Sequence, residues 1–169
     1  RFYPKLIQIE KERSEFMPAK KLKLYLDSEN IKYVSIYHAA ASTAQRIAAS
    51  SHIPGKELAK TVMLKVDGKL TMAVLPSSSS INFESFKRAV KAEKVELASE
   101  LAFINLFPDC EVGAMPPFGN LYGIDVYVAD NLAEDEEIAF NAGTHSELIR
   151  MAYQDFVKVV NPRVARFTR

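Results

Sequence analysis

The sequence predicts an α+β domain with a mixed β-sheet, and two features of the pattern lead to this fold class. Segments typical of strands and of helices are intermingled, without the regular strand–helix–strand repeat of a parallel α/β protein. Two strand-like segments, residues 61–66 and 70–75, flank Asp67-Gly68, which is a strong signal for a two-residue hairpin turn. A chain of 169 residues without an internal repeat fits one domain.

Helices are expected where apolar residues recur at helical spacing or where a capping residue opens a segment. Residues 19–29 place leucines and a tyrosine on one face and lysines and acids on the other. Ser42 can cap a second helix over residues 42–51. Asn82 can cap a third, and Ser99 opens a short fourth that ends near the Phe-Pro pair at 107–108.

A capping box is expected near the end of the chain. Thr144 and Glu147 have the required spacing, so a final helix is predicted from there to about residue 153. His145 would then be its first residue, where the positive helix end disfavours protonation of the imidazole. An ordinary surface histidine near a cap is the alternative interpretation.

The remaining strands and one shaped loop complete the predicted fold. Strands are expected at residues 33–37, 124–128 and 137–141, and residues 156–160 close the domain. Three of the six glycines and two of the eight prolines fall within residues 113–123. This composition indicates a loop with a fixed shape.

The expected domain covers residues 17–161. The segment Met17-Pro18-Ala19 looks like a natural start, so residues 1–16 are expected to be an extension outside the fold. Residues 162–169 are expected to form a basic C-terminal tail.

Composition excludes several classes of protein. The net charge of +1 excludes a strongly basic nucleic-acid-binding tail but leaves room for a local basic face. No apolar run approaches the roughly 20 residues that a membrane-spanning helix needs. The single cysteine, Cys110, cannot form an internal disulfide, and the three scattered histidines offer no metal-ligand spacing. We therefore expect a soluble, cytoplasmic protein without a metal site.

Two further features could carry chemistry. Lys60 opens the first hairpin strand, where its ammonium group could project into a cleft and attract a phosphate or polarise a carbonyl. The alternative is a surface lysine whose stem packs on apolar neighbours. Residues 113–119 form a Gly- and Pro-rich loop whose backbone could approach a ligand closely. The alternative is an ordinary turn-rich connection.

Basic side chains gather in three places and could follow an RNA backbone. In the middle cluster acidic residues are interleaved, which also fits a solvated helix face. The residues concerned are Lys20, Lys21, Lys23, Lys87, Arg88, Lys91, Lys94, Arg163, Arg166 and Arg169.

Taken in order along residues 20–160, these features resemble the YbaK/ProRS-associated family of tRNA-editing deacylases. The elements that carry the resemblance are residues 38–43, Lys60 with residues 61–65, the motif Gly113-x-x-x-Pro117 with Phe-Gly after it, and residues 141–145. No single element is specific, whereas their order and spacing are. The resemblance implies a partly barrel-like mixed sheet with flanking helices and hydrolysis of the ester of a mischarged tRNA.

The resemblance also implies roles for particular residues. Lys60, Gly113, Pro117 and His145 would be catalytic, with Lys60 near the terminal phosphate or carbonyl and the loop positioning the ester. Often the family has serine before the loop proline, whereas this chain has Pro116, which removes a side-chain hydrogen bond expected there. Met63, Met115 and Phe118 are candidate pocket walls. The full set of expected substrate-binding residues is Thr43, Met63, Ala114, Met115, Pro116, Phe118, Gly119, Gly143 and Thr144.

The expected partners are an aminoacylated tRNA and an aminoacyl-tRNA synthetase, with no cofactor and no membrane. Alanine, cysteine or proline on a proline tRNA are the expected substrates, and serine on another tRNA stays open. Two alternatives to an enzyme also stay open at this point. One is a non-catalytic module that binds tRNA or an aminoacyl-nucleotide, and the other is a regulatory protein-interaction domain of the same fold.

Overall fold

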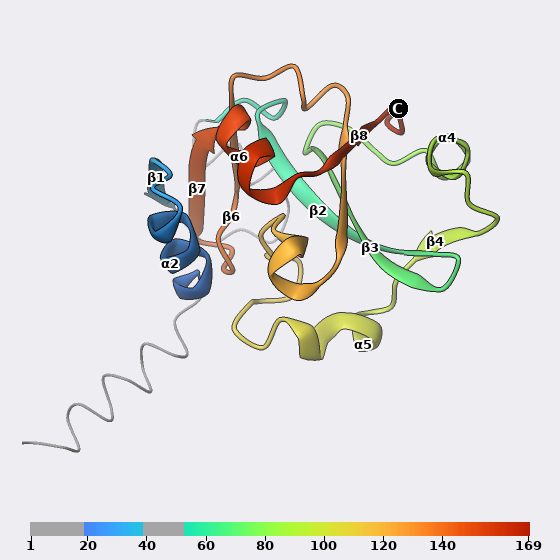
Figure 1. Ribbon diagram of the computed structural model, residues 1–169, viewed down its shortest axis with the longest axis horizontal. Helices are drawn as coiled ribbons and strands as arrows, with labels where there is room; N and C mark the ends of the chain where they lie inside the picture. Colours follow the sequence, from blue (N-terminus) through green and yellow to red (C-terminus); the bar gives the residue numbers. More distant parts are fainter. Residues whose placement is uncertain (1–18, 39–52) are drawn as a thin grey trace, which may run out of the picture.

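The computed structural model describes residues 19–38 and 53–169 and confirms the α+β class, with one mixed sheet flanked by helices (Figure 1). The helices are α2 (Lys20–Ser28), α4 (Phe83–Val90), α5 (Glu100–Phe103) and α6 (Tyr153–Val160), with 3-10 turns η1 (Ile104–Leu106) and η2 (Gly119–Tyr122). The strands are β1 (Tyr33–Tyr37), β2 (Leu58–Val66), β3 (Lys69–Pro76), β4 (Val95–Leu97), β5 (Asp125–Ala129), β6 (Glu137–Asn141), β7 (Glu147–Ala152) and β8 (Arg163–Ala165). The helix expected over residues 42–51 lies outside the described residues.

The described strands form one sheet in the order β1-β7-β6-β2-β3-β5-β8, with β4 paired to β2. The pairs β2–β6, β3–β5 and β5–β8 are parallel and the other pairs are antiparallel. Strand β2 is therefore central, because it contacts β3 along one edge and β6 and β4 along the other. This strand carries Lys60 and Met63.

The β2–β3 hairpin is confirmed at its predicted turn. Asp67 and Gly68 have φ of 49° and 83°, the positive values that this two-residue turn requires. The Asp67 carboxylate also accepts the backbone N–H of Glu93 at 3.0 Å and of Lys94 at 2.8 Å. One side chain thus links the hairpin to the segment that leads into β4.

Helices cover both faces of the sheet. The larger core lies on the face covered by α2, α5 and α6, where Leu22, Leu26 and Phe156 are buried. A smaller core lies under α4, which contributes the buried Phe86. In Figure 1, α4 accordingly stands apart from α2 and α6. None of the described helices is long and apolar enough to cross a membrane.

The predicted cap of α4 is confirmed. Asn82 Oδ1 accepts the backbone N–H of Ser85 at 3.0 Å, which satisfies one of the free donors at the start of the helix. Ser99 precedes α5 as expected, but its side chain makes no cap bond.

The predicted helix over residues 144–153 is wrong, because residues 147–152 form strand β7 and α6 begins only at Tyr153. The Glu147 side chain does not return to a cap. It is buried and pairs with Lys23 of α2 at 2.5 Å. Leu148 and Ile149 are adjacent and both fully buried, which suits a strand covered on both faces.

The end of the chain is part of the fold and not a separate tail. Strand β8 pairs with β5, and Thr168 forms an isolated bridge with Ile81. Phe167 is fully buried, with its ring centroid 4.9 Å from that of Phe86. The residues after 161 therefore complete the core under α4.

Candidate functional site

Two short segments that are distant in sequence lie against each other and form the centre of the site. Glu111 donates its backbone N–H to the Gly143 carbonyl at 2.8 Å, and Gly143 donates to the Ala114 carbonyl at 3.0 Å. The Gly113 loop and the turn after β6 are thus joined by main-chain bonds. The fold places residues 111–114 beside residues 143–146.

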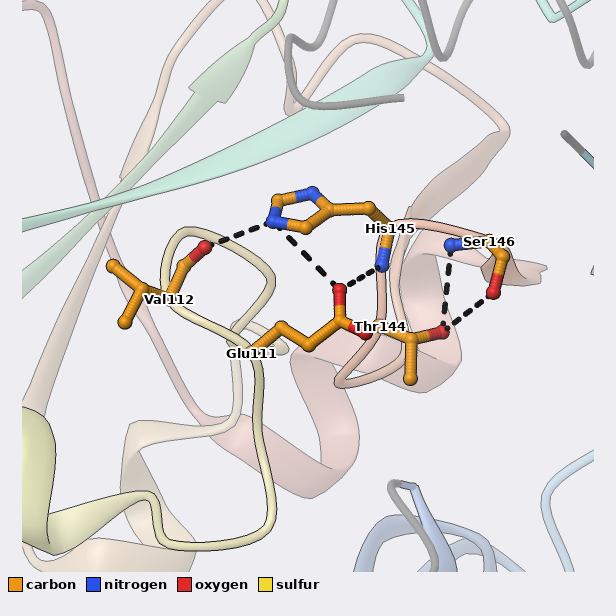
Figure 2. A network of polar contacts seen from close by, with 5 residues as sticks. All are labelled: Glu111, Val112, Thr144, His145 and Ser146. Carbon is orange, nitrogen blue, oxygen red and sulfur yellow. Dashed lines mark hydrogen bonds and ion pairs between the residues drawn. The ribbon is translucent and has the colours of Figure 1, made fainter. Parts of the chain in front are cut away.

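His145 lies in this junction, and Figure 2 shows its ring directed at Val112. Its Nε2 donates to the Val112 carbonyl at 2.8 Å, so a neutral ring carries its proton on Nε2. Its backbone N–H donates to Glu111 Oε2 at 3.0 Å. The other ring nitrogen, Nδ1, is buried and bonds to no described residue, which leaves one lone pair for a ligand or water.

The backbone conformation at positions 113 and 143, where the two segments meet, favours glycine. Gly113 has φ of 82° and Gly143 has φ of 97°, values that side-chain-bearing residues rarely adopt. A Cβ atom on Gly113 would lie 3.6 Å from His145 Cε1, which is an ordinary contact. The backbone conformation, and not crowding, therefore selects glycine at position 113.

Thr144 has a local role that differs from the expected helix cap. Its Oγ1 accepts the Ser146 backbone N–H at 3.4 Å and lies 3.3 Å from Ser146 Oγ (Figure 2). This is a side-chain-supported turn that leads into β7. Because no helix begins at His145, the expected effect of a positive helix end on its imidazole does not apply.

A cavity of about 210 Å³ opens next to the Gly113 loop. Met63 and Met115 line it, as expected of pocket walls. Phe103 of α5 adds a third apolar side chain, and Gly113 forms part of the rim. The cavity is mostly apolar and has backbone groups of the loop at its edge.

Three of the predicted site residues are buried in the loop and do not line this cavity, namely Pro116, Pro117 and Phe118. Pro116 and Pro117 are buried, and the Pro116 carbonyl accepts the Phe118 N–H at 2.8 Å in a tight turn centred on Pro117. Phe118 is fully buried among aromatic rings of the core. The expectation that Phe118 is a pocket wall is therefore not met for this cavity.

Gly119 also has a packing role. A Cβ atom there would lie 2.5 Å from the Ile124 carbonyl oxygen and 2.7 Å from Val126 Cγ2. We expect Gly119→Ala to lower the free energy of unfolding by about 1–3 kcal/mol because the backbone must shift. Urea denaturation measures this change. Gly123→Asn is the matched control, since Asn tolerates the φ of 67° and no atom lies within 4 Å of that Cβ position. An unchanged midpoint for Gly119→Ala would contradict the close approach.

Lys60 lies on β2, opposite Leu75 of β3, and does not line the cavity. Strand alternation places it on the face of β2 that carries Leu58 and Leu64, whereas Met63 points to the other face. Burial lowers its pKa from the ordinary value of 10.5. An ammonium group that has lost part of its hydration favours an anion or a carbonyl oxygen as its neighbour.

The end of β6 connects Lys60 to the loop. Ala59 and Phe140 are the last pair of the parallel β2–β6 register, and Lys60 and Asn141 directly follow this pair along their strands. Asn141 Oδ1 is buried and bonds to no described residue. Gly143, two residues after Asn141, forms main-chain hydrogen bonds with the loop that contains Gly113. Thr43, the remaining predicted binding residue, lies outside the described residues.

The amino-acid sequence of this chain matches a known class of domain. The family model of the aminoacyl-tRNA editing domain matches residues 38–159, which include Lys60, Gly113 and His145. The chain belongs to the aminoacyl-tRNA editing domain family. The family resemblance seen in the sequence is confirmed.

Relatives of this editing domain include a tRNA deacylase. The chain is 26% identical over 153 residues to the multifunctional Ser/Thr-tRNA deacylase ProXp-y of Escherichia coli K12, covering 85% of this chain and 89% of that protein. A solved structure of a hypothetical protein has a TM-score of 0.78 and 19% identity, covering 88% of this chain and 99% of its own. A candidate trans-editing enzyme for prolyl-tRNA synthetase has a TM-score of 0.76 and 17% identity, with coverage of 89% and 96%. The two structures establish the shared fold.

Two residues of this candidate site had no signal in the sequence. Glu111 and Val112 supply both partners of His145, one through a carboxylate and the other through a carbonyl. A histidine in a site commonly has such partners. Neither residue has a periodic or motif signal, however, because both lie in a loop that only the tertiary fold brings to His145.

Proposed function

We propose that this editing domain hydrolyses the ester that joins an amino acid to the terminal adenosine of a mischarged tRNA. Membership of the family supports this class of reaction. The observation that carries the proposal for this chain is a pair of backbone donors at the cavity that bond to no described residue.

The two donors are the N–H groups of Gly113 and Met115. Neither bonds to a described residue, whereas the intervening Ala114 N–H donates to the Glu111 carbonyl at 3.0 Å. Both residues line the cavity. Because the next two residues are prolines, which have no N–H, the loop offers these two donors from a stiff frame. Fixed amide donors of this kind stabilise the negative charge that develops on a carbonyl oxygen.

The reaction needs no protein nucleophile in this scheme, since an aminoacyl ester is already activated. Water adds to the ester carbonyl carbon, the bond from that carbon to the ribose oxygen breaks, and a water proton ends on the ribose oxygen. Gly113 and Met115 hold the carbonyl oxygen. Lys60, which lies outside the cavity, supplies positive charge to the terminal phosphate, and Nδ1 of His145, which bonds to no described residue, accepts a hydrogen bond from the water or a ribose hydroxyl.

The size of the cavity sets which amino acid is accepted. Met63, Phe103 and Met115 form apolar walls around about 210 Å³. A single methylene changes binding by only about 1–3 kcal/mol, so discrimination among small amino acids should be partial. Alanine, cysteine or proline on a proline tRNA is the proposed substrate, and serine and threonine belong in the same test because of the ProXp-y relative.

The test is release of labelled amino acid from a panel of tRNAs charged with these amino acids. We expect multiple turnovers at substoichiometric enzyme for a subset of the panel, and each reaction is repeated with prolyl-tRNA synthetase present. Release that needs the synthetase would identify it as a partner. Tight binding of the charged tRNAs without release under either condition would refute hydrolysis and leave a non-catalytic binding module.

A further inference from the structure

Glu111 contacts both segments of the site with its backbone and its side chain. Its N–H donates to the Gly143 carbonyl at 2.8 Å, and its own carbonyl accepts the Ala114 N–H at 3.0 Å. Its carboxylate accepts the His145 N–H at 3.0 Å (Figure 2). No motif of the sequence assigned this residue a role.

The carboxylate bond differs from the backbone bonds because a side chain makes it and it can be removed by substitution. The side chain is 54% exposed, so solvent screens its charge and the bond adds little to global stability. Its effect should be local. The bond fixes the backbone of His145, whose ring then reaches the Val112 carbonyl at 2.8 Å.

The consequence reaches the proposed donors of the loop. Val112 and Gly113 follow Glu111 directly, so the residues that hold His145 also set the direction of the Gly113 N–H. Loss of the carboxylate bond leaves the main-chain bonds between the loop and the turn at residues 143–146 in place. It releases the backbone of His145, so the histidine can move relative to the loop. A small displacement of a catalytic group can reduce the rate by up to about 100-fold.

We propose that Glu111 is a positioning residue of this site, which holds the His145 backbone and ring against the Gly113 loop without contacting substrate. The proposal rests on the proposed deacylase function. Glu111 Oε2 also lies 3.9 Å from His145 Nε2, which is too long for a hydrogen bond. The backbone bond, and not a carboxylate–imidazole pair, therefore carries the positioning.

The test compares Glu111→Ala, Glu111→Gln and the matched control Glu134→Gln, an exposed acidic residue on the segment between β5 and β6. The first readout is hydrogen exchange of the His145 amide by NMR, measured without substrate. We expect at least about 10-fold faster exchange in Glu111→Ala. Glu111→Gln keeps a side-chain oxygen as acceptor, so exchange should remain near the wild-type rate, as in Glu134→Gln.

The second readout is deacylation of whichever charged tRNA the wild type hydrolyses. We expect kcat to fall roughly 10-fold in Glu111→Ala with KM changed less than about twofold, and glutamine to restore most of kcat. Wild-type exchange in Glu111→Ala would overturn the proposal, and so would lost activity that glutamine fails to restore. If the wild type hydrolyses nothing, the deacylase function fails, while the exchange readout still decides whether Glu111 holds His145.

Discussion

Lys60→Ala is expected to reduce kcat/KM for deacylation by about 10- to 100-fold, the loss expected when a charged contact to the terminal phosphate of the substrate is removed. The reason is that burial has already stripped part of the water from this ammonium group, as its lowered pKa indicates. Its charge is therefore available to a phosphate or carbonyl at low additional cost. Alanine removes the charge but leaves β2 paired to β3 and β6.

The matched control is Lys65→Ala. Lys65 lies on the same strand as Lys60 but at its other end, where it is opposite Glu96 of β4. We expect wild-type deacylation for this variant. Initial rates on one hydrolysed tRNA decide the comparison, and thermal unfolding checks that both variants fold. Equal rates for Lys60→Ala and the wild type would remove Lys60 from the mechanism while leaving the Gly113 loop in place.

The pH dependence provides a second test of Lys60. Burial lowers its pKa from 10.5, so the group loses its proton at a lower pH than a solvated lysine. If the charged form is required, enzymatic deacylation falls as pH rises through this lowered pKa. Lys60→Arg should move the fall to higher pH, because arginine stays protonated. Rates are corrected for spontaneous ester hydrolysis, and identical profiles for lysine and arginine would contradict a required lysine charge.

The sequence predicted the local structure correctly where a turn or a helix end requires a particular type of residue. The positive φ at Asp67 and Gly68 and the cap bond of Asn82 are needs of this kind, and both predictions were confirmed. The capping box failed because Glu147 is instead buried at the start of β7, where it pairs with the half-buried Lys23 of α2. Sequence spacing cannot show a partner that lies more than 100 positions away.

The site was predicted only in part for a related reason. Gly113 and His145 do lie together, but their adjacency came from the order of motifs in a family and not from any property of either segment. Glu111 joins them and carries no local signal. The sequence does not distinguish a pocket wall from a core anchor at Phe118, because an aromatic residue next to a glycine loop fits both.

Phe118→Ala is accordingly expected to lower the free energy of unfolding by about 3–5 kcal/mol, the usual cost of truncating a fully buried aromatic side chain. The ring is fully buried, with centroids of Phe140 and Phe156 at 5.4 Å and 5.6 Å and that of Tyr25 at 6.5 Å. Truncation leaves a void between α2, α6 and the sheet that these rigid elements cannot close. Chemical denaturation measures the loss in the free energy of unfolding. The control is Leu101→Ala, because Leu101 is 88% exposed and its truncation should change stability by less than about 0.5 kcal/mol.

Phe118→Leu separates the core role from a pocket role. Leucine fills most of the space, so we expect a smaller loss, of about 1.5 kcal/mol or less, and a protein that is fully folded at assay temperature. A core residue then leaves kcat/KM and the choice of amino acid unchanged, because the buried ring lies beneath the loop and not in the cavity lined by Met63 and Met115. A pocket wall would instead shift the preference toward a larger amino acid, since a shorter side chain enlarges the site. Such a shift in a folded Phe118→Leu variant would return this residue to the substrate pocket.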